Sequence, residues 1–581
     1  QALLVLDGEW GLWKHNLSSV MCDEWVTEDA IAHCNPQGMV TSLYLMGTTL
    51  NGSHLCNIRR FTALTTLVIG KPPWDSQWIG ADYDVPTGDY DYSSDPYVEP
   101  NPTDSIPVNQ STMGPPVMQG SMDDLSCLAP LTRLQTLSLT NLNLTAGELP
   151  SSLSALTSLR HLDLSFLRIT RLPQWISSLS RLAYLDVTGS FDVHLIAPFP
   201  TEWMALTGLA ALRVGLNGFT GSIPSTISAL TALSNLDLHY NSLLGSIPAG
   251  ISNLTSLQYL QLSHNNLAGA VPALDLAHFV DLSHNHLTTM PPNIGSSEIN
   301  LSHNDLKGSV PAYGFYQLNN IDLSYNPLNE ISDALFLDYS VAVVDSLNFG
   351  SCNFSGPFPW LPALRFINID VSNNSFTGPF PDVLLNVDAF SYLTNINLSH
   401  NNFTGSLSPM IYEMTLLETL NISHNRFSGA VPSDAWALSS LKSLSMAHNQ
   451  LEGPLPNQMG FVKLTVLELQ GNAFSGPLPD LAHWKFTSLL VLDVSDNQLN
   501  GSLPDSISRF VTLQHLGIGG NKLSGPIPAG LGRLIELTSL NISGTRLTCP
   551  ADGSKCVVQQ ASNSSFCRLC SSFCSSCTPR L

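Results

Sequence analysis

Leucine and other apolar residues recur along the chain in one repeated pattern. Leu236, Leu238, Asn241 and Leu243 form one copy. Side chains alternate across a strand, so the two leucines of Leu-x-Leu point to the same side of a short strand. The asparagine three residues after the strand is expected to turn inward, with its carboxamide paired to backbone groups of the turn. The pattern therefore predicts many short strands, each followed by a turn.

This sequence pattern continues over most of the chain. Asn241 and Asn265 are 24 residues apart, and shorter steps occur around Asn285. One coil of this length cannot bury its own leucines, but stacked coils can bury them, with a parallel sheet that advances about 4.8 Å per coil. Counting the repeats between residues 40 and 547 gives about twenty coils.

Many coils continue with Gly-x-Ile-Pro or a close relative, as in Gly221-Ser-Ile-Pro224 and Gly525-Pro-Ile-Pro528. Glycine permits a backbone bend and proline fixes the exit from it. Over most of residues 39–548 the sequence resembles the plant-type leucine-rich repeat of plant receptor ectodomains and polygalacturonase-inhibiting proteins. The resemblance implies an α/β solenoid: a right-handed leucine-rich-repeat superhelix with a concave parallel β-sheet and disulfide-containing caps.

Departures from the repeat divide the chain. Residues 1–38 resemble the N-terminal cap of that family, and residues 39–70 hold the first repeats. Residues 71–126 form an acidic insertion rich in Pro, Asp and Tyr, which is expected to be either a contact loop or a solvated loop. A third alternative is a weak Ca²⁺ site in the insertion, formed by Asp82, Asp84, Asp89 and Asp91. The spacing of these aspartates is not that of an EF-hand. Repeats resume over 127–548, and 549–581 form a Cys-rich C-terminal cap or tail.

The cysteines lie mainly near the two ends of the chain. Cys56 and Cys127 stand at similar offsets before the leucines of their coils, so stacking is expected to bring them together as a disulfide. The cap resemblance implies a Cys22–Cys34 disulfide. Cys352 takes the place of an inward asparagine and is expected to be a buried free thiol. Three disulfides, of open connectivity, are expected in the tail in preference to a zinc site. Its cysteines are Cys549, Cys556, Cys567, Cys570, Cys574 and Cys577.

The composition limits the cellular compartments and the classes of partner that suit this chain. The 581 residues carry a formal net charge of -22, with only 12% charged residues, which argues against a nucleic-acid partner. No apolar run is long enough to span a membrane, and the start at Gln1 without a methionine is expected for a mature chain.

Asn-x-Ser/Thr sequons and the clustered cysteines together predict a secreted or extracellular glycoprotein of the cell surface or cell wall. N-linked glycans are expected, and no other cofactor. The sequons stand at Asn16, Asn51, Asn109, Asn143, Asn253, Asn300, Asn353, Asn373, Asn397, Asn402, Asn421, Asn500, Asn541 and Asn563.

No sequence motif indicates catalysis. Nucleophile elbows, phosphate loops and distinct carboxylate pairs are not evident, so neither an enzyme nor catalytic, cofactor-binding or metal-binding residues are expected. The resemblance places the binding face on the outward positions of the strands, which are polar and weakly acidic. The residues expected to form this face are Arg213, Asp237, His239, Gln261, Asp281, Asp322, Asp370, Glu468 and Asp493.

One repeat position is rich in histidine. His264, His284 and His303 share it, as do His400, His424 and His448. Stacking would set neighbouring side chains about 5 Å apart. The column is either a pH-sensitive or metal-binding stripe, or surface positions inherited through repeat duplication.

The leading functional hypothesis is an extracellular recognition module that binds a protein, peptide or glycan through the solenoid surface. Two alternatives are a structural glycoprotein of the cell surface or matrix whose copies assemble with one another, and an inhibitor of a wall-degrading enzyme. The sequence leaves the ligand open.

Overall fold

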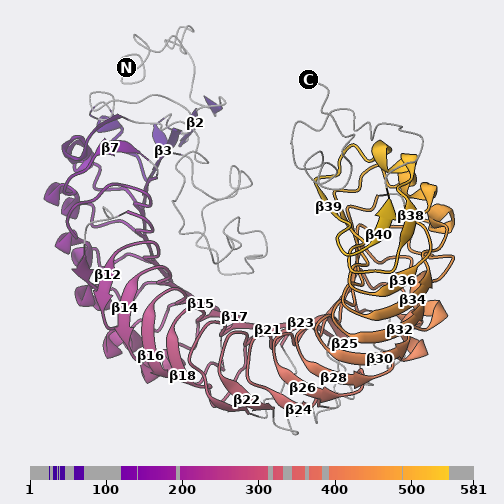
Figure 1. Cartoon of the computed structure of the whole chain (residues 1–581). Helices are drawn as coiled ribbons and strands as arrows, with labels where there is room; N and C mark the ends of the chain where they lie inside the picture. The colour runs from indigo at the N-terminus through magenta and orange to yellow at the C-terminus, as the bar shows by residue number, and fades with distance from the viewer. Residues whose placement is uncertain are drawn as a thin grey trace, which may run out of the picture. The chain divides into compact units, whose positions relative to one another are not determined.

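The computed structural model describes most of the repeat region. The described residues are 25–26, 30–35, 37, 39–45, 56, 58–70, 119–140, 142–190, 196–275, 277–311, 318–331, 343–359, 365–381, 392–486 and 488–548. The chain divides into two compact units, Gln1–His286 and Leu287–Leu581, called unit 1 and unit 2. In each unit the coils are stacked, and each coil contributes a short strand to a long sheet (Figure 1).

The long sheet of unit 1 is parallel from its third strand onward. Its first strands, β1 (Trp25–Val26), β2 (Ala30–Cys34) and β3 (Val40–Leu45), pair antiparallel, which the repeat pattern does not predict. The parallel strands that follow β3 are β4 (Thr66–Ile69), β6 (Thr136–Leu139), β8 (His161–Asp163), β9 (Tyr184–Asp186), β11 (Ala211–Arg213), β13 (Asn235–Asp237), β15 (Tyr259–Gln261) and β17 (Phe279–Asp281).

The strands of the long sheet in unit 2 are also parallel. They are β19 (Glu298–Asn300), β21 (Asn320–Asp322), β23 (Val343–Asn348), β25 (Arg365–Asp370), β27 (Asn395–Asn397), β29 (Thr419–Asn421), β31 (Ser443–Ser445), β33 (Val466–Glu468), β35 (Val491–Asp493), β37 (His515–Gly517) and β39 (Ser539–Asn541). Among the described residues the strands of the long sheets number 22, which agrees with about twenty coils.

The core between the sheet and the opposite side of each coil is apolar. In unit 1, Leu212 pairs with Leu236 and Leu236 with Leu260, and all three leucines are fully buried. In unit 2, four buried phenylalanines follow one another with ring centroids 5.9, 6.2 and 6.1 Å apart: Phe354, Phe376, Phe403 and Phe427. Each coil thus completes the core of the coils beside it, as a solenoid requires.

The inward asparagines form hydrogen bonds that connect successive coils. The Asn425 Nδ2 donates to the carbonyl oxygens of Leu398, Ile422 and Ser423 at 2.8 to 3.1 Å, and its Oδ1 accepts from the Phe403 N–H at 3.0 Å. Asn241 makes the equivalent bonds in unit 1. Both side chains are buried, so the predicted inward position and backbone pairing are confirmed.

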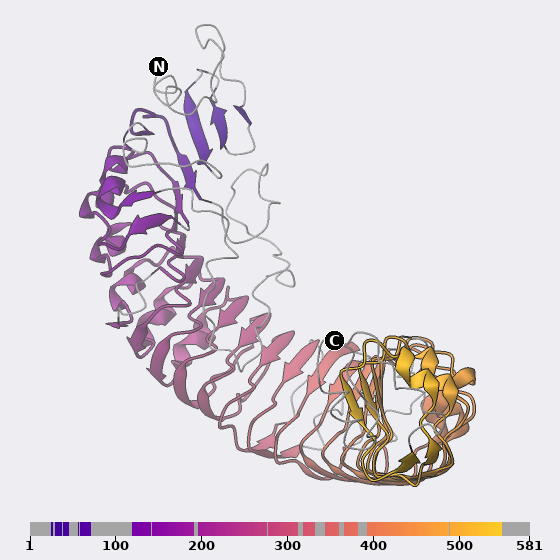
Figure 2. The same cartoon turned by 45° about the horizontal axis from the view of Figure 1, so that its top comes forward.

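The side of each coil away from the long sheet carries short strands and 3-10 helices (Figure 2). The short strands are β5 (Gln119–Ser121), β7 (Asn143–Thr145), β10 (Ala197–Pro198), β12 (Phe219–Gly221), β14 (Ser242–Gly245), β16 (Asn266–Ala270), β18 (His286–Thr289), β20 (Gly308–Val310), β22 (Leu328–Ile331), β24 (Ser355–Pro357), β26 (Ser375–Gly378), β28 (Asn402–Gly405), β30 (Arg426–Ala430), β32 (Gln450–Pro454), β34 (Ala473–Pro477), β36 (Gln498–Asn500), β38 (Ser524–Pro526) and β40 (Arg546–Thr548).

The 3-10 helices begin after a proline in most coils, because proline fixes the backbone that enters the helix. They are η3 (Met122–Leu128), η4 (Ser151–Ala155), η5 (Gln174–Ser178), η6 (Thr201–Ala205), η7 (Ser225–Ala229), η8 (Ala249–Asn253), η11 (Pro409–Glu413), η12 (Ser433–Ala437), η13 (Leu481–His483), η14 (Asp505–Arg509) and η15 (Ala529–Arg533). These coils are the leucine-rich-repeat solenoid that the sequence predicts.

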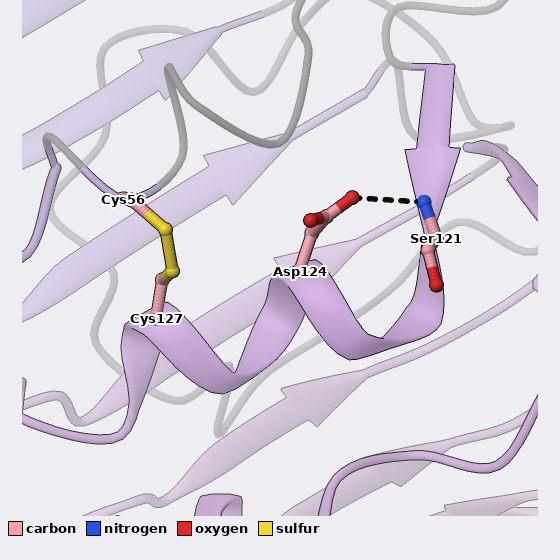
Figure 3. The surroundings of a disulfide bond; sticks show 4 residues. All are labelled: Cys56, Ser121, Asp124 and Cys127. Atoms are coloured by element: carbon pink, nitrogen blue, oxygen red, sulfur yellow. Dashed lines mark hydrogen bonds between the residues drawn. A yellow bond between two sulfur atoms is a disulfide. The ribbon is translucent and has the colours of Figure 1, made fainter.

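Repeat structure resumes before residue 127, within the stretch that the sequence analysis assigns to the insertion. Strand β5 pairs with β7, and helix η3 follows with Leu125 buried. The Ser121 N–H donates to Asp124 Oδ2 at 2.8 Å, and the Ser121 hydroxyl accepts from the Asp123 N–H, which caps the helix (Figure 3). Leucine spacing alone missed this coil because its strand, Gln-Gly-Ser, carries no leucine.

The cysteines of the described residues fall into two kinds. Cys56 and Cys127, the pair that stacking is expected to join, form a disulfide (Figure 3). Cys352 is a buried free thiol whose Sγ lies 3.3 Å from the Leu323 carbonyl oxygen, and burial raises the pKa of this thiol to about 12.

Several predictions concern residues outside the described part of the chain. Cys34 is disulfide-bonded, but its expected partner Cys22 lies outside. So do the six tail cysteines and the four aspartates of the insertion, together with the sequons Asn16, Asn51, Asn109 and Asn563. Across the described residues, no helix has the length and apolar character needed to cross a membrane.

Candidate functional site

The solvent-facing side of the unit 1 sheet carries two aligned rows of side chains. The middle residue of each three-residue strand enters the core, so the first and third residues face outward. The first residues form the ring row: His161, Tyr184, Ala211, Asn235, Tyr259 and Phe279. The third residues form the charged row: Asp163, Asp186, Arg213, Asp237, Gln261 and Asp281.

Aromatic side chains stack at both ends of the ring row. The rings of His161 and Tyr184 are 4.0 Å apart and nearly parallel, and those of Tyr259 and Phe279 are 4.7 Å apart. Ala211 and Asn235 stand between the two pairs and carry no ring. The row of rings is therefore interrupted over three strand steps, about 14 Å, between Tyr184 and Tyr259. This gap in the rings is covered by other side chains, since Ala211 and Asn235 are both buried.

Two aspartates of the charged row are fully buried and adjacent. Asp163 accepts hydrogen bonds from the Ser165 N–H and hydroxyl at 2.9 and 2.7 Å and from the Ser138 hydroxyl at 3.1 Å. Burial, and then the charge of Asp186, raise the pKa of Asp163 to about 7. Burial also raises the pKa of Asp186. The pair therefore holds a proton at pH values where an exposed aspartate has lost it.

Arg213 supplies the positive charge of the row. Its guanidinium carbon lies 5.9 Å from the centroid of the Tyr184 ring, a cation–π distance. On the next strand, burial alone would raise the pKa of Asp237, but His239 and Arg213 hold it below its ordinary value. The His239 Nδ1 contacts the Asp237 carboxylate, and the ring of His239 occupies the space that a β-carbon at Gly215 would fill.

Amide atoms on two neighbouring strands lack hydrogen-bond partners within the described part of the chain. Asn235 is only 4% exposed, yet neither its Nδ2 nor its Oδ1 is paired. The Oε1 of Gln261 is likewise buried and unpaired. Nearly all buried polar groups in proteins are hydrogen-bonded. Six residues further on, the buried Asn241 uses both ends of its carboxamide.

The outward residues of the unit 2 sheet pair with one another instead. The Asn348 Nδ2 donates to Asp322 Oδ2 at 2.8 Å, and the Asn397 Nδ2 donates to Asp370 Oδ2 at 2.8 Å. The first positions of these strands hold mainly small polar residues, as in Ser346. Several side chains of this polar face therefore pair within the sheet.

The structure brings together some of the predicted binding-face residues and separates others. Arg213, Asp237, Gln261 and Asp281 are consecutive in the charged row, and His239 contacts Asp237. In unit 2, Glu468 and Asp493 are neighbours, whereas Asp322 and Asp370 are separated by the strand of Asn348.

Sequence reasoning missed Asp163, Asp186 and the whole ring row. Apart from His239, it considered only the residue between the two leucines, and only in coils that carry an inward asparagine. The residue before the first leucine also faces outward, because side chains alternate along a strand, so the same alternation could have identified these positions.

The histidine column is a second, narrower surface. In unit 1 the rings of Tyr240, His264 and His284 stack at 3.9 and 4.1 Å, all in the left-handed backbone region. In unit 2 the rings of His303 and Tyr325 stack at 4.1 Å. His400, His424 and His448 stack at 4.1 and 4.3 Å, and burial, followed by the two neighbouring imidazoles, lowers the pKa of His424.

Parallel stacking keeps the ring nitrogens of the column from converging on one point. Consistent with this, the described residues contain no group of three or more His, Cys, Asp or Glu side chains placed to hold a metal ion. The arrangement of the unit 1 sheet suits recognition by hydrogen bonds, charge and ring contacts.

Comparisons with known proteins agree with this architecture. The profile described as leucine-rich repeat matches residues 207–267, 391–451, 488–510 and 512–534. A comparison with curated protein sequences gave no significant match.

Solved structures of plant receptor ectodomains are similar in fold. The plant peptide hormone receptor RGFR1 in complex with RGF2 is 24% identical, with a TM-score of 0.66 over 89% of this chain and 83% of that one. The Arabidopsis receptor kinase HAESA, in complex with the peptide hormone IDA and the co-receptor SERK1, is 24% identical, with a TM-score of 0.65 over 92% and 90%.

The leucine-rich-repeat ectodomain of the receptor kinase GASSHO1/SCHENGEN3 from Arabidopsis thaliana, in complex with CASPARIAN STRIP INTEGRITY FACTOR 2, is 26% identical, with a TM-score of 0.62. The match covers 88% of this chain and 59% of that ectodomain. The repeat profiles, the inward asparagine ladder and the solenoid fold lead to one conclusion: the chain carries leucine-rich repeats and folds as a leucine-rich-repeat solenoid similar to those of the plant receptor ectodomains.

Proposed function

We propose that the chain is an extracellular recognition module that binds an extended peptide along the outward face of the unit 1 sheet. The observation that carries the proposal is the paired rows of unit 1, where ring faces, a guanidinium and unpaired amide atoms share one surface. These are the groups that give protein interfaces their affinity. The peptide complexes of similarly folded plant receptors support the same ligand class.

Charge favours a basic peptide. The chain has a formal net charge of -22, and Asp237, whose pKa lies below its ordinary value, keeps a negative charge within the charged row. An acidic field raises the local concentration of cationic ligands and speeds their association. Since the fold itself is shared by proteins with many ligands, the sheet surface and its charge decide the ligand class.

Peptide display tests this function. A library of random twelve-residue peptides is selected on the full chain, and the enriched peptides are titrated against two matched variants. Gln261→Lys and Glu468→Lys each place a lysine at a half-buried third strand position, one in each unit. The charge changes by +1 in Gln261→Lys and by +2 in Glu468→Lys, so the control in unit 2 carries the larger change. The expected result is enrichment of basic peptides whose Kd rises about tenfold or more in Gln261→Lys, with little change in Glu468→Lys. Failure to enrich any peptide, or equal losses in the two variants, contradicts the proposal.

A further inference from the structure

The gap in the ring row has the features of a binding subsite. Ala211 is the smallest side chain of the row, and Asn235 beside it keeps a buried carboxamide with both ends unpaired among the described residues. A side chain that is neither exposed nor bonded carries an unfavourable desolvation cost, unless a ligand supplies the missing bonds.

The flanking groups define what fits the gap. Tyr184 and Tyr259 bound it on the two sides, each supported from behind by a stacked partner ring. An extended chain rises about 3.4 Å per residue, so the distance of about 14 Å between the two tyrosines corresponds to roughly four residues of a peptide that runs along the row. Because Ala211 and Asn235 are buried, the side chains that cover them have to move before the peptide can enter. Asp237 keeps its negative charge beside the gap, and the chain has a formal net charge of -22, so acidic side chains are disfavoured in those residues.

A carboxamide is chemically matched to a peptide backbone. It donates through Nδ2 and accepts through Oδ1 at the same time. In an extended chain the N–H and C=O of one residue point to the same side, so one carboxamide can pair with both groups. The unpaired Gln261 Oε1 lies one strand away, where it can accept a further N–H from the ligand.

We propose that Ala211 and Asn235 form the floor of a subsite for one backbone residue of an extended, cationic peptide, with Asn235 pairing to the N–H and C=O of that residue. This inference rests on the proposed function and names Asn235 as the residue that forms hydrogen bonds to the peptide backbone. Tyr184 and Tyr259 contact the side chains on either side of the paired residue. Tyr259 and Arg213 are half-buried, so their rotamers can change to admit the peptide.

Two substitutions separate recognition from a structural role. Asn235→Leu removes both polar ends at similar size, and Ala211→Phe fills the gap with a ring while leaving Asn235 in place. The probes are the peptides enriched on the full chain, measured by fluorescence anisotropy. The expected result is a Kd about 10- to 100-fold higher in each variant. The Tm of Asn235→Leu is expected to be equal to or higher than that of the unchanged chain, because an unpaired buried amide is replaced by an apolar side chain.

An ester scan of the peptide locates the paired residue. Each backbone N–H is replaced in turn by an ester oxygen. One ester position is expected to weaken binding to the unchanged chain about tenfold and to have no such effect on Asn235→Leu. The proposal is overturned if Asn235→Leu binds the peptides as tightly as the unchanged chain, if it lowers the Tm, or if the ester effects are the same in both proteins. If no peptide is enriched at all, the proposed function fails, and the subsite fails with it.

Discussion

The two units build their long sheets from the same coil and use the exposed face differently. In unit 1 the outward positions hold stacked rings, buried aspartates, one arginine and an unpaired asparagine. In unit 2 the same positions hold amides and acids that bond to one another, as Asn397 does to Asp370. The leucines and inward asparagines are common to both.

This difference separates the residues that make the fold from those available for function. A coil needs only its inward residues to stack, so the outward residues are free to vary from coil to coil. Where outward residues satisfy one another, the sheet gains little from a ligand. Where they stay buried without partners, a ligand can supply what the fold does not.

The largest expected effect comes from the disulfide, which the described residues show only in unit 1. Cys56→Ser with Cys127→Ser opens a loop of sequence separation 71. The chain-entropy argument gives a loss of about 4 kcal/mol. Calorimetry should show a lower transition for unit 1 and an unchanged one for unit 2, with Cys352→Ala as the control in unit 2. Equal lowering of both transitions would mean that the units do not unfold independently.

The second effect is a pH dependence of stability set by Asp163. Its ordinary pKa is 3.8, and burial raises it to about 7 in the folded chain, so the folded state keeps a proton that the unfolded state loses. The associated stability is fully present below about pH 4 and is lost as the pH rises through about 7. Between pH 5 and pH 8, which includes about two pH units below the folded pKa, the change is on the order of 3 kcal/mol.

Urea unfolding at pH 5 and pH 8 measures that loss. Asp163→Asn, which cannot ionise, is expected to flatten the difference between the two pH values. The same slope in the variant and in the unchanged chain would show that other groups set the pH dependence.

A third effect distinguishes the two kinds of buried asparagine. Asn241→Leu leaves the Phe219 N–H without its partner and removes one of two donors from each of three carbonyl groups, which should cost about 2 kcal/mol or more. Asn235→Leu should cost nothing. Chemical denaturation of the two variants side by side measures this difference in the free energy of unfolding. The difference disappears if Asn235 also stabilises the fold.

The difference between Asn241 and Asn235 shows which features of the structure the sequence could predict and which it could not. Periodicity identified Asn241 as inward and bonded, because its position repeats and its partners are backbone groups present in every coil. Asn235 stands at a position that varies from coil to coil, and its lack of partners depends on which side chains stand on the neighbouring strands. The ring stacks and the raised pKa of Asp163 depend on the same pairings between coils, which a single coil's sequence does not contain.

A fourth, smaller effect concerns the wall of the gap. Tyr259→Leu removes the ring that stacks on Phe279 and is expected to cost about 1 kcal/mol of stability. Peptide affinity should fall as well, because the side chain beside the paired residue loses its contact. A normal affinity measured by anisotropy would place the peptide elsewhere on the face.

The smallest expected effect concerns glycan occupancy in unit 2. The Nδ2 of Asn397, the atom that carries an N-linked glycan, donates to Asp370 within the sheet, whereas Asn500 is exposed on the short strand β36. Intact-glycopeptide mass spectrometry of the secreted chain is expected to find Asn500 occupied and Asn397 bare. A glycan on Asn397 would show that the Asn397–Asp370 pair does not persist in the mature protein.

Photo-cross-linking tests the central claim, that the unit 1 sheet is the recognition face, most directly. Enriched peptides carrying a photoreactive group are irradiated with the full chain, and mass spectrometry locates the adducts. The account predicts adducts within residues 184–261, reduced in Ala211→Phe. Adducts confined to residues 397–493, or unchanged by that substitution, would contradict it.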